Sequence, residues 1–255
     1  MLISTDVGSG PVVVLLHAFP LDRRMWLPQI EALADMYRVI APDLPGFGDS
    51  PLLTNASIDA FADQVAEHLD DKDIDEPVTL GGLSMGGYVA LAFARKYPER
   101  LAGLVLADTK AEADDATARA NRDKMMATAT SVGAGAIMEA MLPKLLGTTT
   151  QQERPEVVAA VRKLGSAQRA ETIVAALKAL RDRPDATPYL KDIAVPTLVL
   201  VGQEDTITPL ANAEKLKRGI TQARLASIPE AGHLANAENP TVFNDLLMTF
   251  LTGVG

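Results

Sequence analysis

The chain of 255 residues contains no cysteine and only three histidines. The lack of cysteine excludes disulfides, iron–sulfur clusters, thiolate zinc sites and a cysteine nucleophile. The small number of histidines disfavours a histidine-rich metal site. The patterns G-x-G-x-x-G and G-x-x-x-x-G-K-[ST] are also absent, so dinucleotide binding and P-loop nucleotide binding have no support. We therefore expect neither a metal ion nor an organic cofactor.

Basic residues and long apolar runs are scarce as well. The 24 Lys and Arg residues stand against 33 Asp and Glu residues, which gives a net charge of −9. This balance argues against nucleic acid and anionic membranes as partners, because both attract basic surfaces. No apolar run approaches the ~20 residues of a membrane span, and no signal peptide is visible at the N-terminus. These features predict a cytoplasmic protein, and they leave its oligomeric state open.

The remaining composition, 47 % apolar and 22 % charged residues, is that of an ordinary globular protein. Short runs rich in Val and Leu predict buried strands of a parallel sheet. They lie at residues 12–16, 37–41, 78–81, 101–107, 197–201 and 224–228. Helical patterns separate them at residues 26–36, 58–69 and 89–97, and one further strand fits at residues 2–7. This alternation predicts an α/β fold with a mostly parallel central sheet of about seven strands and helices on both faces.

Residues 110–187 interrupt this alternation. They are rich in alanine, contain no Phe, Trp or Tyr, and show helical periodicity. We expect a helical cap there, inserted between core residues 1–109 and core residues 188–255. Because thioether side chains fit varied shapes, Met125, Met138 and Met141 are candidates for lining an apolar substrate pocket. The alternative is that these methionines simply pack the cap against the core.

The sharpest motif is residues 82–87, GLSMGG, which contain the pattern G-x-S-x-G. A predicted strand precedes it and a predicted helix follows it, which is the context expected of a nucleophilic serine on a strained strand-to-helix turn. The flanking glycines allow a turn too tight for side chains. Ser84 is therefore the candidate nucleophile, and it requires a base to remove its proton.

Only His17, His68 and His233 could be that base. His233 lies in a loop just beyond the last predicted strand, where reactive groups of an open parallel sheet gather. His68 lies at the flank of a helix's apolar stripe and is expected on the surface. His17 ends the first strong strand and is expected to brace the following loop. His233 is thus the predicted base.

A carboxylate must orient the histidine. Asp205 follows the predicted strand at residues 197–201 and is the favoured acid, with the neighbouring Glu204 expected to point elsewhere. Asp108, which follows the strand at residues 101–107, is the rival. For the oxyanion hole we expect the backbone N–H of Met85, directly after the nucleophile, and that of Phe19 in the loop after residues 12–16.

Five motifs in order carry a resemblance to the α/β-hydrolase superfamily. They are residues 17–20 (HAFP), 43–50 (DLPGFGDS), 82–87, 202–209 (GQEDTITP) and 231–234 (AGHL). The resemblance covers essentially the whole chain, and it implies a cap where residues 110–187 fall. The chain is most similar to small esterases, 3-oxoadipate enol-lactonases, cofactor-free perhydrolases and C–C hydrolases. It departs from many relatives in Ala18, which replaces a glycine and requires a negative φ, and in its short N-terminus, which implies that the family's first strand is missing.

These observations predict a hydrolase of the carboxylesterase type that acts on a small ester or lactone through an acyl-enzyme on Ser84. A specific lactonase, such as a 3-oxoadipate enol-lactonase, is the alternative within the enzyme class. A small-molecule sensor with this fold and little turnover is the alternative from another class, because fold alone does not determine function.

Overall fold

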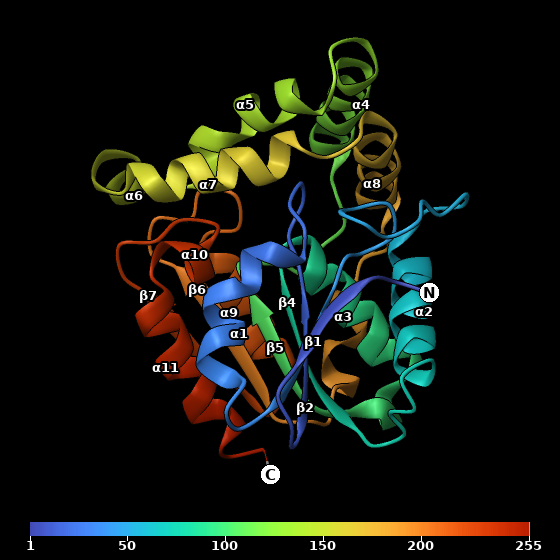
Figure 1. Cartoon of the computed structure of the whole chain (residues 1–255), viewed down its shortest axis with the longest axis vertical. Coiled ribbons are helices and arrows are strands. Elements are labelled where there is room, and N and C mark those ends of the chain that lie inside the picture. Colours follow the sequence, from blue (N-terminus) through green and yellow to red (C-terminus); the bar gives the residue numbers. More distant parts are fainter. Residues whose placement is uncertain (255) are drawn as a thin grey trace.

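The computed structural model describes residues 1–254, and within them the central sheet has seven strands. They are β1 (Ser4–Val7), β2 (Val12–Leu16), β3 (Arg38–Pro42), β4 (Val78–Leu83), β5 (Leu101–Ala107), β6 (Thr197–Gly202) and β7 (Ala223–Ile228). The spatial order is β1-β3-β2-β4-β5-β6-β7; β1 pairs antiparallel with β3, and all other pairs are parallel (Figure 1). The predicted α/β class and its strands are confirmed, with boundaries that differ by one or two residues.

Helices cover both faces of the sheet because alternate strand residues belong to two different cores. Val14 and Leu16 pack in one core with α2 (Ile58–Asp70) and α3 (Met85–Lys96), whereas Val13 and Leu15 pack in the other. The second core also contains side chains of α1 (Leu27–Leu33) and α11 (Pro240–Leu251), and α9 (Leu210–Gly219) belongs to the first. This two-sided burial explains why the strands are apolar at consecutive positions.

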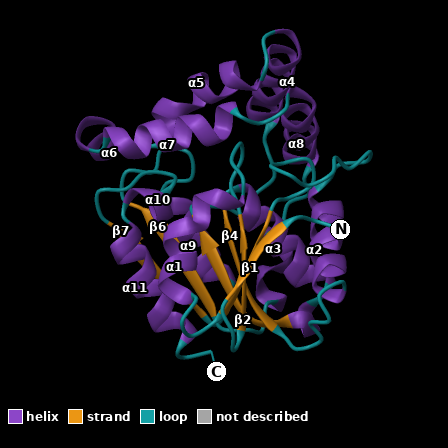
Figure 2. Cartoon of the chain, viewed as in Figure 1, coloured by secondary structure: helices purple, strands orange, loops and turns teal. Residues whose placement is uncertain are grey.

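The chain between β5 and β6 is helical. Its helices are α4 (Ala116–Ser131), α5 (Ala134–Leu145), α6 (Thr148–Glu153), α7 (Pro155–Ser166) and α8 (Ala170–Asp182). They lie beyond the C-terminal ends of the strands, with α4 packed on α8 and α5 packed on α7 (Figures 1 and 2). The chain returns to the core through a 3₁₀ helix, Thr187–Asp192. Where it leaves and re-enters the core, the N–H of Ala186 donates to the carbonyl of Ala111 at 2.9 Å.

The expectation that His68 lies on the surface is wrong. Its side chain is buried, and its Nε2 lies 3.0 Å from the Ser4 hydroxyl of β1. The antiparallel edge strand thus covers the flank of α2, which no local pattern in the helix indicates. Burial, and then the charge of Lys72, lowers the pKa of His68 to about 4.

Among residues 1–254, no helix has the length and apolar character needed to cross a bilayer.

Candidate active site

Ser84 lies on the sharp turn between β4 and α3, with φ +54° and ψ −110°. A positive φ is strained for a residue with a side chain, and such strain gathers at functional sites. The turn holds because its flanks are bare: a Cβ on Gly82 would overlap the carbonyl of Gly86, and a Cβ on Gly86 would overlap the carbonyl of Leu16. The Thr109 hydroxyl donates to the Ser84 carbonyl at 2.9 Å and ties the turn to the end of β5.

The structure brings Ser84, His233 and Asp205 together from three separate strand ends. The Ser84 Oγ lies 2.8 Å from Nε2 of His233, and Nδ1 of His233 lies 2.8 Å from Oδ2 of Asp205. His233 and Asp205 are buried, whereas Ser84 is half-buried. Because Asp205 accepts at Nδ1, the proton of a neutral imidazole resides there, and Nε2 is free to accept the serine proton.

Asp205 is held as a carboxylate by its own loop. Its oxygens accept the N–H of Ile207 at 2.7 Å, the N–H of Thr208 at 3.0 Å and the Thr208 hydroxyl at 2.7 Å. Burial opposes ionisation, but the charge and hydrogen bond of His233, and then the two hydrogen bonds of Thr208, lower the pKa of Asp205 below its ordinary value. Sequence reasoning did not single out Thr208, because a threonine in a turn carries no signal of such contacts.

The two rival carboxylates lie elsewhere. Asp108 is buried, and its oxygens accept the N–H groups of Gly202 at 2.8 Å and Ala235 at 3.3 Å. Within the described residues it has no hydrogen bond to His233. Burial, and then the charge of Asp205, raises the pKa of Asp108 well above its usual range. Glu204 points away and accepts the N–H of Thr149 at 2.9 Å.

Two backbone N–H groups are available for an oxyanion. Met85 is the first residue of α3, and Phe19 follows the end of β2. Among residues 1–254, neither N–H donates to another protein group. The N–H at the start of a helix also lies at the positive end of the helix dipole. Ala18 has a negative φ, as its side chain requires, and its N–H faces Met25 Sδ at 3.2 Å.

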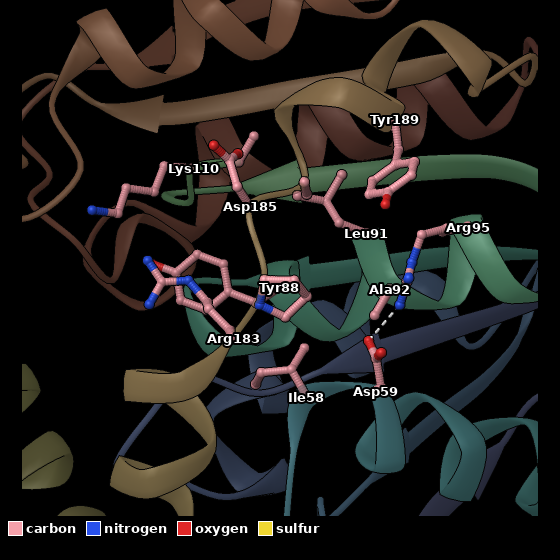
Figure 3. A pocket seen from close by; sticks show the side chains of 13 residues that line it. Ile58, Asp59, Tyr88, Leu91, Ala92, Arg95, Lys110, Arg183, Asp185 and Tyr189 are labelled. Carbon is pink, nitrogen blue, oxygen red and sulfur yellow. Dashed lines mark hydrogen bonds and ion pairs between the residues drawn. The ribbon is translucent and has the colours of Figure 1, made fainter. Parts of the chain in front are cut away.

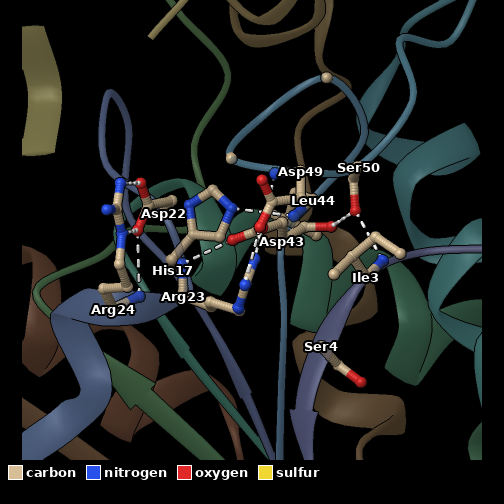
Figure 4. Close-up of polar contacts among 12 residues, drawn as sticks. Ile3, Ser4, His17, Asp22, Arg23, Arg24, Asp43, Leu44, Asp49 and Ser50 are labelled. Carbon is tan, nitrogen blue, oxygen red and sulfur yellow. Dashed lines mark hydrogen bonds and ion pairs between the residues drawn. The ribbon is translucent and has the colours of Figure 1, made fainter. Parts of the chain in front are cut away.

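His17 braces this loop from below. Its Nε2 accepts the N–H of Leu44 at 2.9 Å, so its Nδ1 carries the proton and donates to the carbonyl of Ala18 at 3.0 Å (Figure 4). Burial lowers the pKa of His17, which keeps the ring neutral. Figure 4 also shows Asp43 paired with Arg23. The buried Phe47 packs edge-on against His17 and Phe19, so residues 43–50 support the loop of Phe19.

A sequence model of the family described as alpha/beta hydrolase fold matches residues 11–240. The chain belongs to this family. It is 32 % identical over 251 residues to a pimeloyl-[acyl-carrier protein] methyl ester esterase of Neisseria meningitidis, covering 95 % of this chain and 94 % of that one. It is 28 % identical over 238 residues to 3-oxoadipate enol-lactonase 2 of Acinetobacter baylyi, covering 93 % and 87 %.

Solved structures agree with this placement among the α/β-hydrolases. A thermophilic esterase from Thermogutta terrifontis, described as malate bound, superposes with a TM-score of 0.97 at 42 % identity, covering 99 % of this chain and 93 % of that one. An enol-lactonase from Burkholderia xenovorans LB400 superposes with a TM-score of 0.91 at 27 % identity, covering 98 % and 96 %.

The methionines of this α/β-hydrolase occupy different environments. Met138 is fully buried, and its thioether lies directly over Gly165 of α7. Met125 and Met141 are only partly buried against the core. For all three methionines, a role in a substrate pocket stays a prediction.

A separate cleft lies beside α3, where the chain leaves and re-enters the core (Figure 3). Tyr88 and Lys110 are among its lining residues, and Arg183 stacks over the Tyr88 ring with 4.2 Å between the guanidinium carbon and the ring centre. Neither Ser84 nor the three candidate methionines line this cleft. It therefore gives no support to the expectation of a methionine-lined pocket.

Proposed function

We propose that this α/β-hydrolase is a serine hydrolase that cleaves carboxylic esters through an acyl-enzyme on Ser84. The observation that carries the proposal is the continuous relay from the Ser84 hydroxyl to His233 and on to Asp205, with both links at 2.8 Å. The esterases and enol-lactonases among its relatives support ester chemistry.

In this reaction, His233 Nε2 takes the proton of Ser84 as the serine oxygen attacks the ester carbonyl. The N–H groups of Phe19 and Met85 stabilise the negative charge on the carbonyl oxygen. His233 then returns the proton to the leaving alcohol, and the acyl group stays on Ser84. Water, deprotonated by His233, releases the acid and restores the serine.

Asp205 stabilises the imidazolium that forms in both half-reactions. The hydrogen bonds from Ile207 and Thr208 keep its carboxylate charged and aimed at Nδ1. An ionised partner fixes the tautomer and offsets the positive charge on the ring. We further propose that residues 110–187 act as the cap that closes over a small-molecule substrate above Ser84.

A lactonase is the second candidate, because the relatives include enol-lactonases of nearly the same length. The same residues would act on a lactone, with one difference in outcome. The alcohol freed from a lactone remains attached to the acyl chain, so no separate product leaves before water attacks.

The test is turnover of a panel of p-nitrophenyl esters and lactones, with Ser84→Ala as the control. We expect hydrolysis that Ser84→Ala abolishes and a single phosphonate adduct, on Ser84. Activity retained in Ser84→Ala, or an adduct on another residue, would reject the mechanism. Binding of esters or lactones without turnover by the unmodified protein would instead identify a sensor.

A further inference from the structure

Buried carboxylates surround the backbone on both sides of His233. One oxygen of Glu238 accepts the N–H of Gly232 at 2.9 Å and that of Leu234 at 3.1 Å. Asp108 accepts the N–H of Ala235 at 3.3 Å. The residue before His233 and the two residues after it are therefore each held by a carboxyl side chain that itself has no hydrogen bond to the imidazole within residues 1–254.

The second oxygen of each carboxylate binds a different segment. Asp108 Oδ1 accepts the N–H of Gly202, three positions before Asp205, at 2.8 Å. Glu238 Oε2 accepts the N–H of Gly147, between α5 and α6, at 2.7 Å. Asp108 thus joins the loops of the acid and the base, and Glu238 joins the loop of the base to the cap.

The three glycines bound in this way also touch one another. A Cβ on Gly202 would overlap the carbonyl of Gly232, and a Cβ on Gly232 would overlap the N–H of Gly147. The acid loop, the base loop and the turn between α5 and α6 therefore meet backbone to backbone at these glycines, and the Glu204 side chain also lies against Gly147. Each segment therefore restricts the movement of the next.

Burying these two carboxyl groups costs free energy. Burial raises the pKa of Glu238 and that of Asp108, and Asp108 also adopts a strained φ of +43°. A buried charge is weak evidence for stability, since apolar replacements are often equally stable. Three carboxyl groups lie around His233, those of Asp108, Asp205 and Glu238. This grouping instead indicates that function requires the imidazole ring to be held in one position.

We propose that Asp108 and Glu238 are positioning residues that hold the His233 imidazole between Ser84 and Asp205. Through its hydrogen bond to Gly147, Glu238 makes this alignment depend on the position of the turn between α5 and α6. The proposal rests on the proposed function of Ser84 and His233. Neither residue touches the reacting atoms. A small misplacement of a catalytic group can lower the rate about 10²-fold. Because neither residue contacts the substrate in this proposal, we expect their replacement to lower kcat and to leave substrate binding nearly unchanged.

The test compares Glu238→Gln and Asp108→Asn with Glu204→Gln. An amide keeps the size of the carboxylate but turns an NH₂ toward at least one of the bound N–H groups. Glu204 is the matched control, because its carboxylate holds Thr149 of the cap but no N–H beside His233. Each variant is assayed with p-nitrophenyl butyrate for kcat and KM, and with a serine-directed phosphonate for both the rate and the final extent of labelling.

We expect Glu238→Gln to lower kcat by roughly 10- to 100-fold, and Asp108→Asn by about three- to tenfold, with KM changed less than about threefold. The rate of phosphonate labelling should fall by the same factors while all of Ser84 is eventually labelled. Glu204→Gln should stay within about twofold of the unmodified enzyme in both rates.

A merely structural role gives a different result: a reduced extent of labelling, with an unchanged rate at each site that does react. That outcome, or equal losses in Glu204→Gln and Glu238→Gln, overturns the proposal. If Glu238→Gln does not fold, Asp108→Asn decides the question from the other side of His233. If the unmodified protein labels with phosphonate but turns over no ester, the proposed function fails, and the labelling rates still test the positioning of His233.

Discussion

At the C-terminal ends of β4 and β6, glycine backbone lies against backbone, whereas at Gly165, in the helices between β5 and β6, backbone lies against a side chain. The glycines at positions 82 and 202 have a neighbouring carbonyl where a Cβ would be, but Gly165 of the cap has the flexible thioether of Met138 there. Helix α4 buries only one of its side chains, that of Ala129. From this difference we expect the core to fix the reacting atoms and residues 110–187, the proposed cap, to adapt their shape, so substitutions in the two regions should have different consequences.

The largest effect is expected within the core, between two buried aspartates at neighbouring strand ends. Asp205→Asn should lower kcat on the order of 10⁴-fold, the loss measured for the same change in a serine protease, because the amide sets the wrong tautomer of the histidine. Asp108→Asn should lose tenfold or less. Steady-state kinetics, with circular dichroism to check the fold, measures both. The reverse order would make Asp108 the triad acid, and near-normal activity in both would mean that neither aspartate alone orients His233.

The comparison between core and cap can be tested directly with two alanines. Gly82→Ala places a Cβ against the carbonyl of Gly86, which cannot move without distorting the turn of Ser84, so we expect loss of folded, active enzyme. Gly165→Ala meets only the Met138 side chain. The gain in helix propensity and the cost of repacking should leave its free energy of unfolding within ~1 kcal/mol of the unmodified protein. Urea unfolding and kcat give the answer; equal damage from both changes would contradict the distinction.

The proposed cap lacks aromatic side chains, so we expect the enzyme to prefer aliphatic acyl groups. Residues 110–187 contain no Phe, Trp or Tyr to stack on an aryl acid. We expect kcat/KM for butyryl esters to exceed that for benzoyl esters by about tenfold, and Met141→Ala to reduce this preference, since each buried CH₂ is worth ≈0.8 kcal/mol. Higher kcat/KM for benzoyl or naphthoyl esters would reject the expectation.

The smallest effect lies at the sheet edge, away from both regions. Because the folded-state pKa of His68 is about 4, the unfolded chain binds its proton at higher pH than the folded chain does. The contribution of His68 to stability is therefore present above about pH 6.5 and is lost as the pH falls toward about 4. His68→Gln should show a weaker fall of the urea midpoint across this window. The pKa of Asp6 is lowered to about 2, chiefly by the hydrogen bond from Arg38, so its protonation affects stability only at lower pH. An identical pH dependence of the urea midpoint in His68→Gln and in the unmodified protein would contradict this account.

The parallel sheet and the grouping of Ser84, His233 and Asp205 follow from local signals in the sequence. Apolar runs mark the strands, and the carboxyl ends of parallel strands meet at one edge of a sheet. Glu238 and the burial of His68 could not be predicted in this way. Glu238 binds Gly147, 91 positions away, and His68 contacts Ser4, 64 positions away. These contacts arise from tertiary packing, and the residues next to Glu238 and His68 in the sequence do not indicate them.

The hydrogen bond between Ala186 and Ala111 has a consequence for how such a molecule changes over generations. Its donor nitrogen on Ala186 lies 2.9 Å from the carbonyl oxygen of Ala111. The segment between these residues therefore leaves the core and returns to it at the same place. Its deletion or exchange would leave a gap that a turn of a few residues can span, and lengthening it would add little closure entropy. The core can therefore retain its strand register while the segment is replaced wholesale, a modular route by which one reaction can acquire new substrates.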